Sequence, residues 1–139
     1  AALGLIPPDL GVVAETADRI VVMYCGRVME TATVEQIFGD PRHPYTAGLM
    51  ASLLRIDTDA DSLYMIEGQP PVAARRPSGC PFHPRCGLAQ APLCVESVPT
   101  LARRTGVHEV ACHFHQETPA WIARELPQIH AAPVEVRSR

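Results

Sequence analysis

Residues 20–38, IVVMYCGRVMETATVEQIF, carry the pattern that decides the fold. The first five residues, Ile20–Tyr24, are β-branched or apolar without a break, which predicts a strand buried on both faces. Cys25-Gly26 predicts a tight hairpin turn, and Arg27–Thr31 a second strand that returns beside the first. A short helix is expected over Val34–Phe38, because the threonine just before it has the side chain of an N-cap.

The residues upstream of this stretch extend the same pattern. Ala1–Ile6 is short and apolar and is followed by Pro7-Pro8, as in a buried strand. Asp9 can then cap a helix that leads to residue 20. A strand, a helix, a hairpin and a capped helix are the end of an α/β domain, because a sheet needs more strands than these to bury both faces.

Residues 9–50, DLGVVAETADRIVVMYCGRVMETATVEQIFGDPRHPYTAGLM, resemble the C-terminal end of the nucleotide-binding subunits of ABC transporters. The similarity is to the peptide importer group, which covers oligopeptide, dipeptide and nickel systems. Its most specific part is PRHPYT at residues 41–46, and it extends over residues 2 to 116. The resemblance implies an α/β fold: the C-terminal end of an ABC nucleotide-binding domain (P-loop NTPase fold), followed by a loop-rich, cysteine-containing extension.

The resemblance also implies an energy-coupling role at the cytoplasmic face of the cell membrane. Such subunits bind ATP and Mg²⁺, hydrolyse ATP at the interface with a second ATP-binding subunit, and drive uptake through permease subunits. This sequence contains no G-x-x-x-x-G-K-[ST] and no LSGGQ-like motif. The fragment is therefore expected to hold no ATP-binding residues and to be inactive on its own, whereas its parent would be an ATPase.

Pro8 stands where the family has its switch histidine, and Pro7 where it has a threonine. Proline has neither an imidazole to reach a γ-phosphate nor a backbone N–H. We therefore expect the parent subunit to hydrolyse ATP poorly.

Four of the five cysteines lie close together in the sequence, with five, seven and seventeen residues between successive members: Cys80, Cys86, Cys94 and Cys112. Thiolates at such spacings can converge on one metal ion or cluster once the loops between them close. Two disulfides or unrelated thiols remain alternatives, although no secretory signal is present. Histidines nearby are reserve ligands: His83, His108, His113 and His115.

The resemblance favours a metal centre, because peptide importer subunits with four cysteines at similar spacing can hold a 4Fe–4S cluster. Zinc held by the same four thiolates is the alternative. The expected role of the metal centre is structural: it would hold a proline-rich segment in place. Cys25, in the predicted turn, is interpreted as having no part in the site. The alternative function is a non-catalytic metal- or iron–sulfur-binding regulatory or interaction module.

Composition and spacing complete the expectations. Fourteen prolines in 139 residues predict a loop-rich second half, and a net charge of −3 gives no reason to expect nucleic acid binding. No apolar run reaches the roughly 18 residues that span a bilayer. His43 is expected to bond nearby backbone ahead of a helix that starts at Pro44 or Tyr45.

The chain is expected to divide into residues 1–38, the end of the ATP-binding domain, 39–116, the extension, and 117–139, a tail. Apolar residues at helical spacing predict a short amphipathic helix over Ala120–Ile129 within that tail, and Ala131–Arg139 is expected to be disordered.

Overall fold

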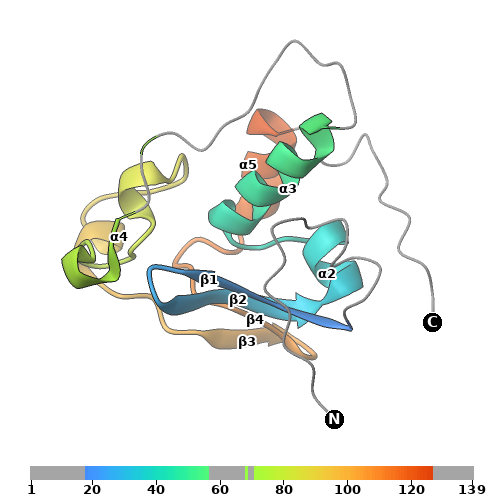
Figure 1. The fold of residues 1–139 in the computed structure, drawn as a ribbon, viewed down its shortest axis with the longest axis horizontal. Helices are drawn as coiled ribbons and strands as arrows, with labels where there is room; N and C mark the ends of the chain where they lie inside the picture. The colour runs from blue at the N-terminus through green and yellow to red at the C-terminus, as the bar shows by residue number, and fades with distance from the viewer. Residues whose placement is uncertain (1–17, 57–67, 69–70, 127–139) are drawn as a thin grey trace.

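The computed structural model describes residues 18–56, 68 and 71–126 (Figure 1). The elements follow one another as β1 (Arg19–Tyr24), β2 (Arg27–Thr33), α2 (Val34–Gly39), α3 (Pro44–Ile56), the 3₁₀ turns η1 (Ala73–Arg75) and η2 (His83–Arg85), α4 (Leu93–Glu96), β3 (Ala102–Thr105), β4 (His108–Val110) and α5 (Thr118–Glu125). The strand predicted at Ala1–Ile6, the helix capped by Asp9, Pro8 and the tail from Ala131 lie outside the described residues.

The hairpin and the capped helix are confirmed. Cys25 and Gly26 both have positive φ, at 52° and 77°, which is the backbone of a two-residue hairpin turn. Thr33 accepts a hydrogen bond from the Gln36 backbone N–H, and the Gln36 side chain accepts one from the Thr33 backbone, which completes a capping box. Helix α3 begins at Pro44, where the fixed φ of proline suits a first turn.

The prediction that the first strand is buried on both faces is wrong for the described structure. Exposure alternates along β1: Ile20, Val22 and Tyr24 are buried, whereas Val21 is 53% and Met23 55% exposed. Figure 1 shows α2, α3 and α5 on one side of the sheet, so among the described residues only one face of β1 is covered. The continuous apolar run Ile20–Tyr24 does not indicate which of the two faces of the strand is buried.

Within the described ranges, the sheet has four antiparallel strands in the order β1-β2-β4-β3. Glu30 of β2 pairs with Val110 of β4, so residues far apart in the sequence share one ladder. The sequence analysis expected a loop-rich second half and predicted neither β3 nor β4. Strand β3 has four residues, ARRT, of which three are polar, so it carries no apolar alternation that could predict a strand.

The hydrophobic core lies between the sheet and the helices. It contains Ile20, Val22, Ala32, Val34, Ile37, Ala47, Met50, Ala51, Trp121, Ile122 and Leu126. The amphipathic helix predicted over Ala120–Ile129 is confirmed for residues 120–125, which belong to α5; residues 127–129 lie outside the described residues. Helix α5 packs into the same core as the hairpin. No helix in the described ranges is long and apolar enough to cross a membrane.

Candidate functional site

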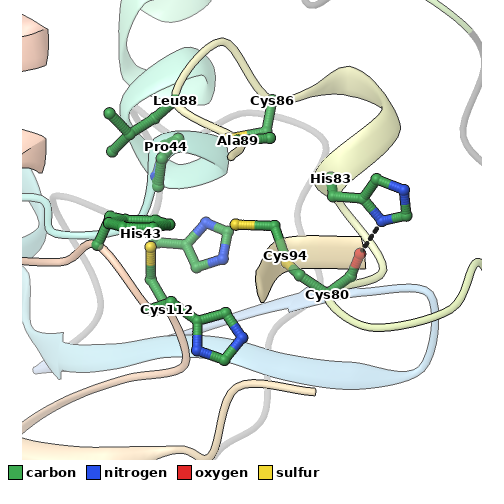
Figure 2. A pocket seen from close by; sticks show the side chains of 11 residues that line it. His43, Pro44, Cys80, His83, Cys86, Leu88, Ala89, Cys94 and Cys112 are labelled. Atoms are coloured by element: carbon green, nitrogen blue, oxygen red, sulfur yellow. Dashed lines mark hydrogen bonds between the residues drawn. The ribbon is translucent and has the colours of Figure 1, made fainter. Parts of the chain in front are cut away.

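The four predicted ligands lie around one small cavity (Figure 2). Cys80 and Cys86 flank η2, Cys94 is in α4, and Cys112 follows β4. All four are free thiols, which excludes the disulfide alternative in this structure. The cavity has a volume of about 20 Å³ and is also lined by His43, Pro44, His83, Leu88, Ala89, His113 and Phe114. The fold thus gathers cysteines that span 33 residues of sequence.

Gly79 allows the segment that carries Cys80 to lie against the segment that carries Cys94. The Cys80 backbone N–H donates to the Cys94 carbonyl at 2.9 Å. Gly79 has φ +64°, and a Cβ there would lie 2.4 Å from that same carbonyl oxygen. Only glycine therefore fits this position without moving one of the two segments.

Backbone N–H groups surround the sulfurs. The Gln90 N–H donates to the Cys94 sulfur at 3.5 Å. The sulfurs of Cys80, Cys86 and Cys112 each interact with backbone groups two or three positions later in the chain, which favour the thiolate form. Such donors stabilise negative sulfur, as in metal-binding cysteine loops.

Burial acts in the opposite direction. It raises the pKa of both Cys86 and Cys112 to about 12 and also raises the pKa of Cys80, and neighbouring sulfurs add to the effect. These three thiols are therefore protonated at neutral pH unless a positive charge enters the cavity. A metal would supply that charge, because a coordinating thiol is deprotonated.

The described residues contain no group of three or more Cys, His, Asp or Glu side chains placed to hold a metal ion. The geometry therefore does not support an iron–sulfur cluster or zinc as it stands, and the four cysteines remain predicted ligands. The donor set fits a soft metal in its chemistry, since it is four sulfurs around one space.

Three of the reserve histidines have other partners. His83 Nδ1 lies 2.9 Å from the Cys80 carbonyl, and His113 Nε2 lies 2.7 Å from the Ser97 carbonyl. His108 Nε2 lies 2.5 Å from a carboxylate oxygen of Glu30. Figure 2 shows the His83 ring turned toward the Cys80 carbonyl and away from the cysteine sulfurs.

Glu30 was missed by sequence reasoning. It is fully buried, and its carboxylate accepts hydrogen bonds from the Arg42 and His43 backbone N–H groups at 2.8 and 3.0 Å, besides pairing with His108. It thereby ties the PRHPYT segment to the sheet. An acidic residue next to Met29 within a predicted strand was the available signal.

His43 caps α3, which confirms the expectation for this residue. Its Nδ1 accepts a hydrogen bond from the Tyr45 backbone N–H at 3.0 Å. The side chain is buried, and burial lowers its pKa from 6.5 to about 4. The imidazole is therefore neutral at physiological pH, and it also lines the cysteine cavity.

The comparisons with known proteins define the class of protein. Residues 29–94 match the family described as the oligopeptide/dipeptide transporter, C-terminal region. This match includes Cys80, Cys86 and Cys94, whereas Cys112 lies beyond it. The chain is therefore similar to the C-terminal part of the ATP-binding subunits of ABC transporters for oligopeptides and dipeptides.

Individual relatives agree with the family. The chain is 45% identical over 116 residues to the oligopeptide transport ATP-binding protein AppD of Bacillus subtilis, covering 84% of this chain and 35% of that protein. It is 50% identical over 88 residues to OppD of Haemophilus influenzae, an oligopeptide transport ATP-binding protein, covering 63% and 27%. It is 41% identical over 109 residues to the dipeptide transport ATP-binding protein DppD of Caldanaerobacter subterraneus, covering 78% and 33%.

The chain spans about a third of the length of the relatives that it matches. Their names concern peptide transport and do not favour the alternative of a stand-alone metal-binding module.

Proposed function

We propose that this chain is the C-terminal part of an ATP-binding subunit that powers an ABC importer for oligopeptides or dipeptides. The observation that carries the proposal is the identity of 41–50% to subunits named for oligopeptide or dipeptide transport. The parent subunit binds ATP and Mg²⁺, pairs with a second ATP-binding subunit, and docks on permease subunits at the cytoplasmic face of the cell membrane. Nickel is the alternative cargo within this family.

Within that parent, this chain supplies the end of the ATP-binding domain, residues 1–38, and the structural extension, residues 39–116. It contains no phosphate-binding loop, so nucleotide chemistry takes place in the remaining two thirds of the parent. The extension packs against the end of that domain, because α3 shares a core with the β1–β2 hairpin.

Reconstitution tests this proposal. The gene with its upstream sequence is expressed with the neighbouring permease genes, and the complex is placed in liposomes that contain ATP. We expect uptake of labelled dipeptides or oligopeptides that requires ATP, and no ATP turnover by the isolated 139-residue chain. An upstream sequence without a phosphate-binding loop, or a complex that transports no peptide, contradicts the proposal.

Pro8 provides a second test in the same complex. A proline cannot supply the imidazole that the family uses at this position, so we expect Pro8→His to raise the rate of ATP hydrolysis. Pro7→Thr alone is the control, because threonine adds no imidazole. Equal ATPase rates in the wild type and Pro8→His would show that the parent does not depend on this position.

We further propose that Cys80, Cys86, Cys94 and Cys112 hold a metal centre, with a 4Fe–4S cluster preferred over zinc. Support comes from the shared cavity and from the backbone donors at the sulfurs. Four bonds of about 2.3 Å to one zinc ion require sulfurs within about 4 Å of each other. A cluster spreads its ligands over four irons, so it needs no such closeness. When bound, the metal centre cross-links η2, α4 and the segment after β4.

Metal analysis of anaerobically purified chain tests this site. We expect iron and acid-labile sulfide in the wild type, or zinc for the alternative, and loss of the metal in Cys112→Ser. Cys25→Ser is the matched control, because Cys25 lies in the β1–β2 turn and does not line the cavity. A wild-type chain that contains neither metal contradicts the proposal.

A further inference from the structure

The Nε2 atom of His43 is buried and lacks a hydrogen-bond partner of normal geometry among the described residues. An unpaired buried donor costs about 1–3 kcal/mol, so such atoms are rare in folded proteins and call for an explanation. The side chain is 1% exposed and lines the cavity around which the four cysteines lie (Figure 2).

The hydrogen bond at the other ring nitrogen determines what Nε2 can do. Nδ1 accepts the Tyr45 N–H at 3.0 Å, so Nδ1 carries a lone pair and no hydrogen. In the neutral ring the hydrogen must then be on Nε2. Nε2 is therefore a donor that needs an acceptor, and it offers no lone pair to a metal.

Two ordinary acceptors fit poorly. A buried water makes two to four hydrogen bonds, and a cavity of about 20 Å³ holds about one water. Most of the lining is carbon and sulfur, which give a water few strong partners. The backbone of Ala111 lies close enough to influence the ring, but it makes no hydrogen bond of normal geometry with Nε2.

We propose that the Nε2–H of His43 donates a hydrogen bond to a sulfur of the metal centre held by the four cysteines. Metal-bound sulfur carries negative charge, so it is a much better acceptor than a neutral thiol. Tyr45 and α3 fix the ring, and Glu30 fixes the backbone that carries it, since its carboxylate accepts the His43 N–H. His43 is thus a positioning residue that links α3 to the cysteine site.

This inference rests on the proposed metal centre, and it assigns to the HPYT segment a role that its helix cap does not explain. A capping side chain needs only Nδ1, and asparagine or serine would serve as well. The cap leaves the second ring nitrogen of His43 without a partner, and the side chain that carries it lines the cavity.

Two variants separate the capping role from the donor role. In His43→Asn the amide oxygen can take the place of Nδ1 and cap α3, but nothing replaces Nε2–H. In His43→Gln the longer side chain can place an amide N–H near the Nε2 position, but it loses the cap. Two readouts are measured on the full 139-residue chain: the rate at which a chelator removes the metal, and the urea midpoint of the metal-free form.

We expect the two readouts to rank the variants in opposite orders. Metal loss should be about 10- to 100-fold faster in His43→Asn than in the wild type, the range seen when outer-shell partners are removed, with His43→Gln closer to the wild type. The metal-free form should instead be at least as stable in His43→Asn as in His43→Gln, because the cap is retained.

The outcomes distinguish the inference from the proposal beneath it. If His43 only caps α3, metal loss will follow the stability of the metal-free form, and His43→Gln will lose metal fastest. That result overturns the hydrogen bond to sulfur and leaves the metal centre in place, as does unchanged metal retention in His43→Asn. A wild-type chain that takes up neither iron nor zinc overturns both.

Discussion

Glu30 illustrates at the scale of one residue how a buried charge holds a loop in place. Its carboxylate accepts two backbone N–H groups and pairs with His108, all without contact with water. In Glu30→Gln the amide nitrogen must face one of these donors, and the charge that His108 pairs with is lost. We expect the free energy of unfolding to fall by about 3 kcal/mol, measured by urea denaturation at pH 7.

Glu125→Gln is the control for this substitution. Glu125 is exposed at the end of α5 and pairs only with its neighbour Arg124 among the described residues, so its change should stay within about 0.5 kcal/mol. Equal effects of the two substitutions would show that the Glu30 network adds little to stability.

His43 predicts a pH dependence at the same scale. Burial lowers its pKa to about 4, whereas the unfolded chain takes up the proton near 6.5, and the nearby Glu30 charge only partly opposes this. The folded state therefore refuses a proton that the unfolded state accepts, and stability is lost as the pH falls from about 6.5 toward 4. The loss is on the order of 3 kcal/mol for this residue.

The measurement is the difference in unfolding free energy between the metal-free wild type and His43→Asn, at several pH values. The wild type should lose its stability relative to the variant between pH 6.5 and 4, and the difference should be constant above pH 7. Parallel pH profiles for the two proteins would show that His43 is not held neutral in the folded state.

At the scale of elements, a comparison of two glycines distinguishes the cost of a left-handed backbone from the cost of a steric clash between two segments. Gly79 and Gly106 both have positive φ, at 64° and 56°, but a Cβ at Gly106 would meet nothing within 4 Å. Gly106→Ala should therefore lower the free energy of unfolding by about 1–2 kcal/mol, which is the cost of a left-handed backbone for a residue with a Cβ. Gly79→Ala should cost more, because the new Cβ displaces the Cys94 segment.

The reactivity of the buried cysteines measures whether the Cys80 and Cys94 segments have moved apart. Cys80 and Cys94 are buried, so their reaction with a thiol reagent should be much faster in Gly79→Ala and unchanged in Gly106→Ala. Similar rates in both variants would show that the contact between the segments does not depend on Gly79.

Elements with strong local signals could be predicted, and those formed by tertiary contacts could not. The β1–β2 turn, the Thr33 cap and the start of α3 at Pro44 depend on residues within a few positions of each other. Strands β3 and β4 have four and three residues; they pair with each other, and β4 joins the sheet by pairing with β2 across about 80 positions. The Glu30–His108 pair is equally remote in sequence, so neither residue could be assigned its partner beforehand.

The same difference applies to the candidate site. The cysteine spacing predicted that four thiols would converge, and they do line one cavity. The orientation of His43 toward that cavity depends on Tyr45, α3 and Glu30 together, which no spacing rule encodes.

At the scale of the whole molecule, one face of β1 is not covered by any other described residue. The sequence of β1 is apolar on both faces, yet Val21 and Met23 are more than half exposed here. A strand that is apolar on both faces is typical of a sheet covered on both sides. We predict that the upstream part of the parent subunit covers this face.

The test compares Val21→Thr with Met23→Thr, singly and together, in the 139-residue chain and in the full-length parent. The isolated chain should change by no more than about 0.5 kcal/mol for each substitution, since both side chains are largely in water. The parent should lose about 1–2 kcal/mol for each, measured by urea denaturation or by resistance to protease, because burying these side chains contributes about that much. Val22→Thr is the control that should destabilise both proteins, because Val22 is already buried in the core. If the parent tolerates the two outer substitutions as well as the isolated chain does, this face of β1 remains in water in the assembled subunit, and the continuous apolar run of the strand reflects β propensity rather than burial.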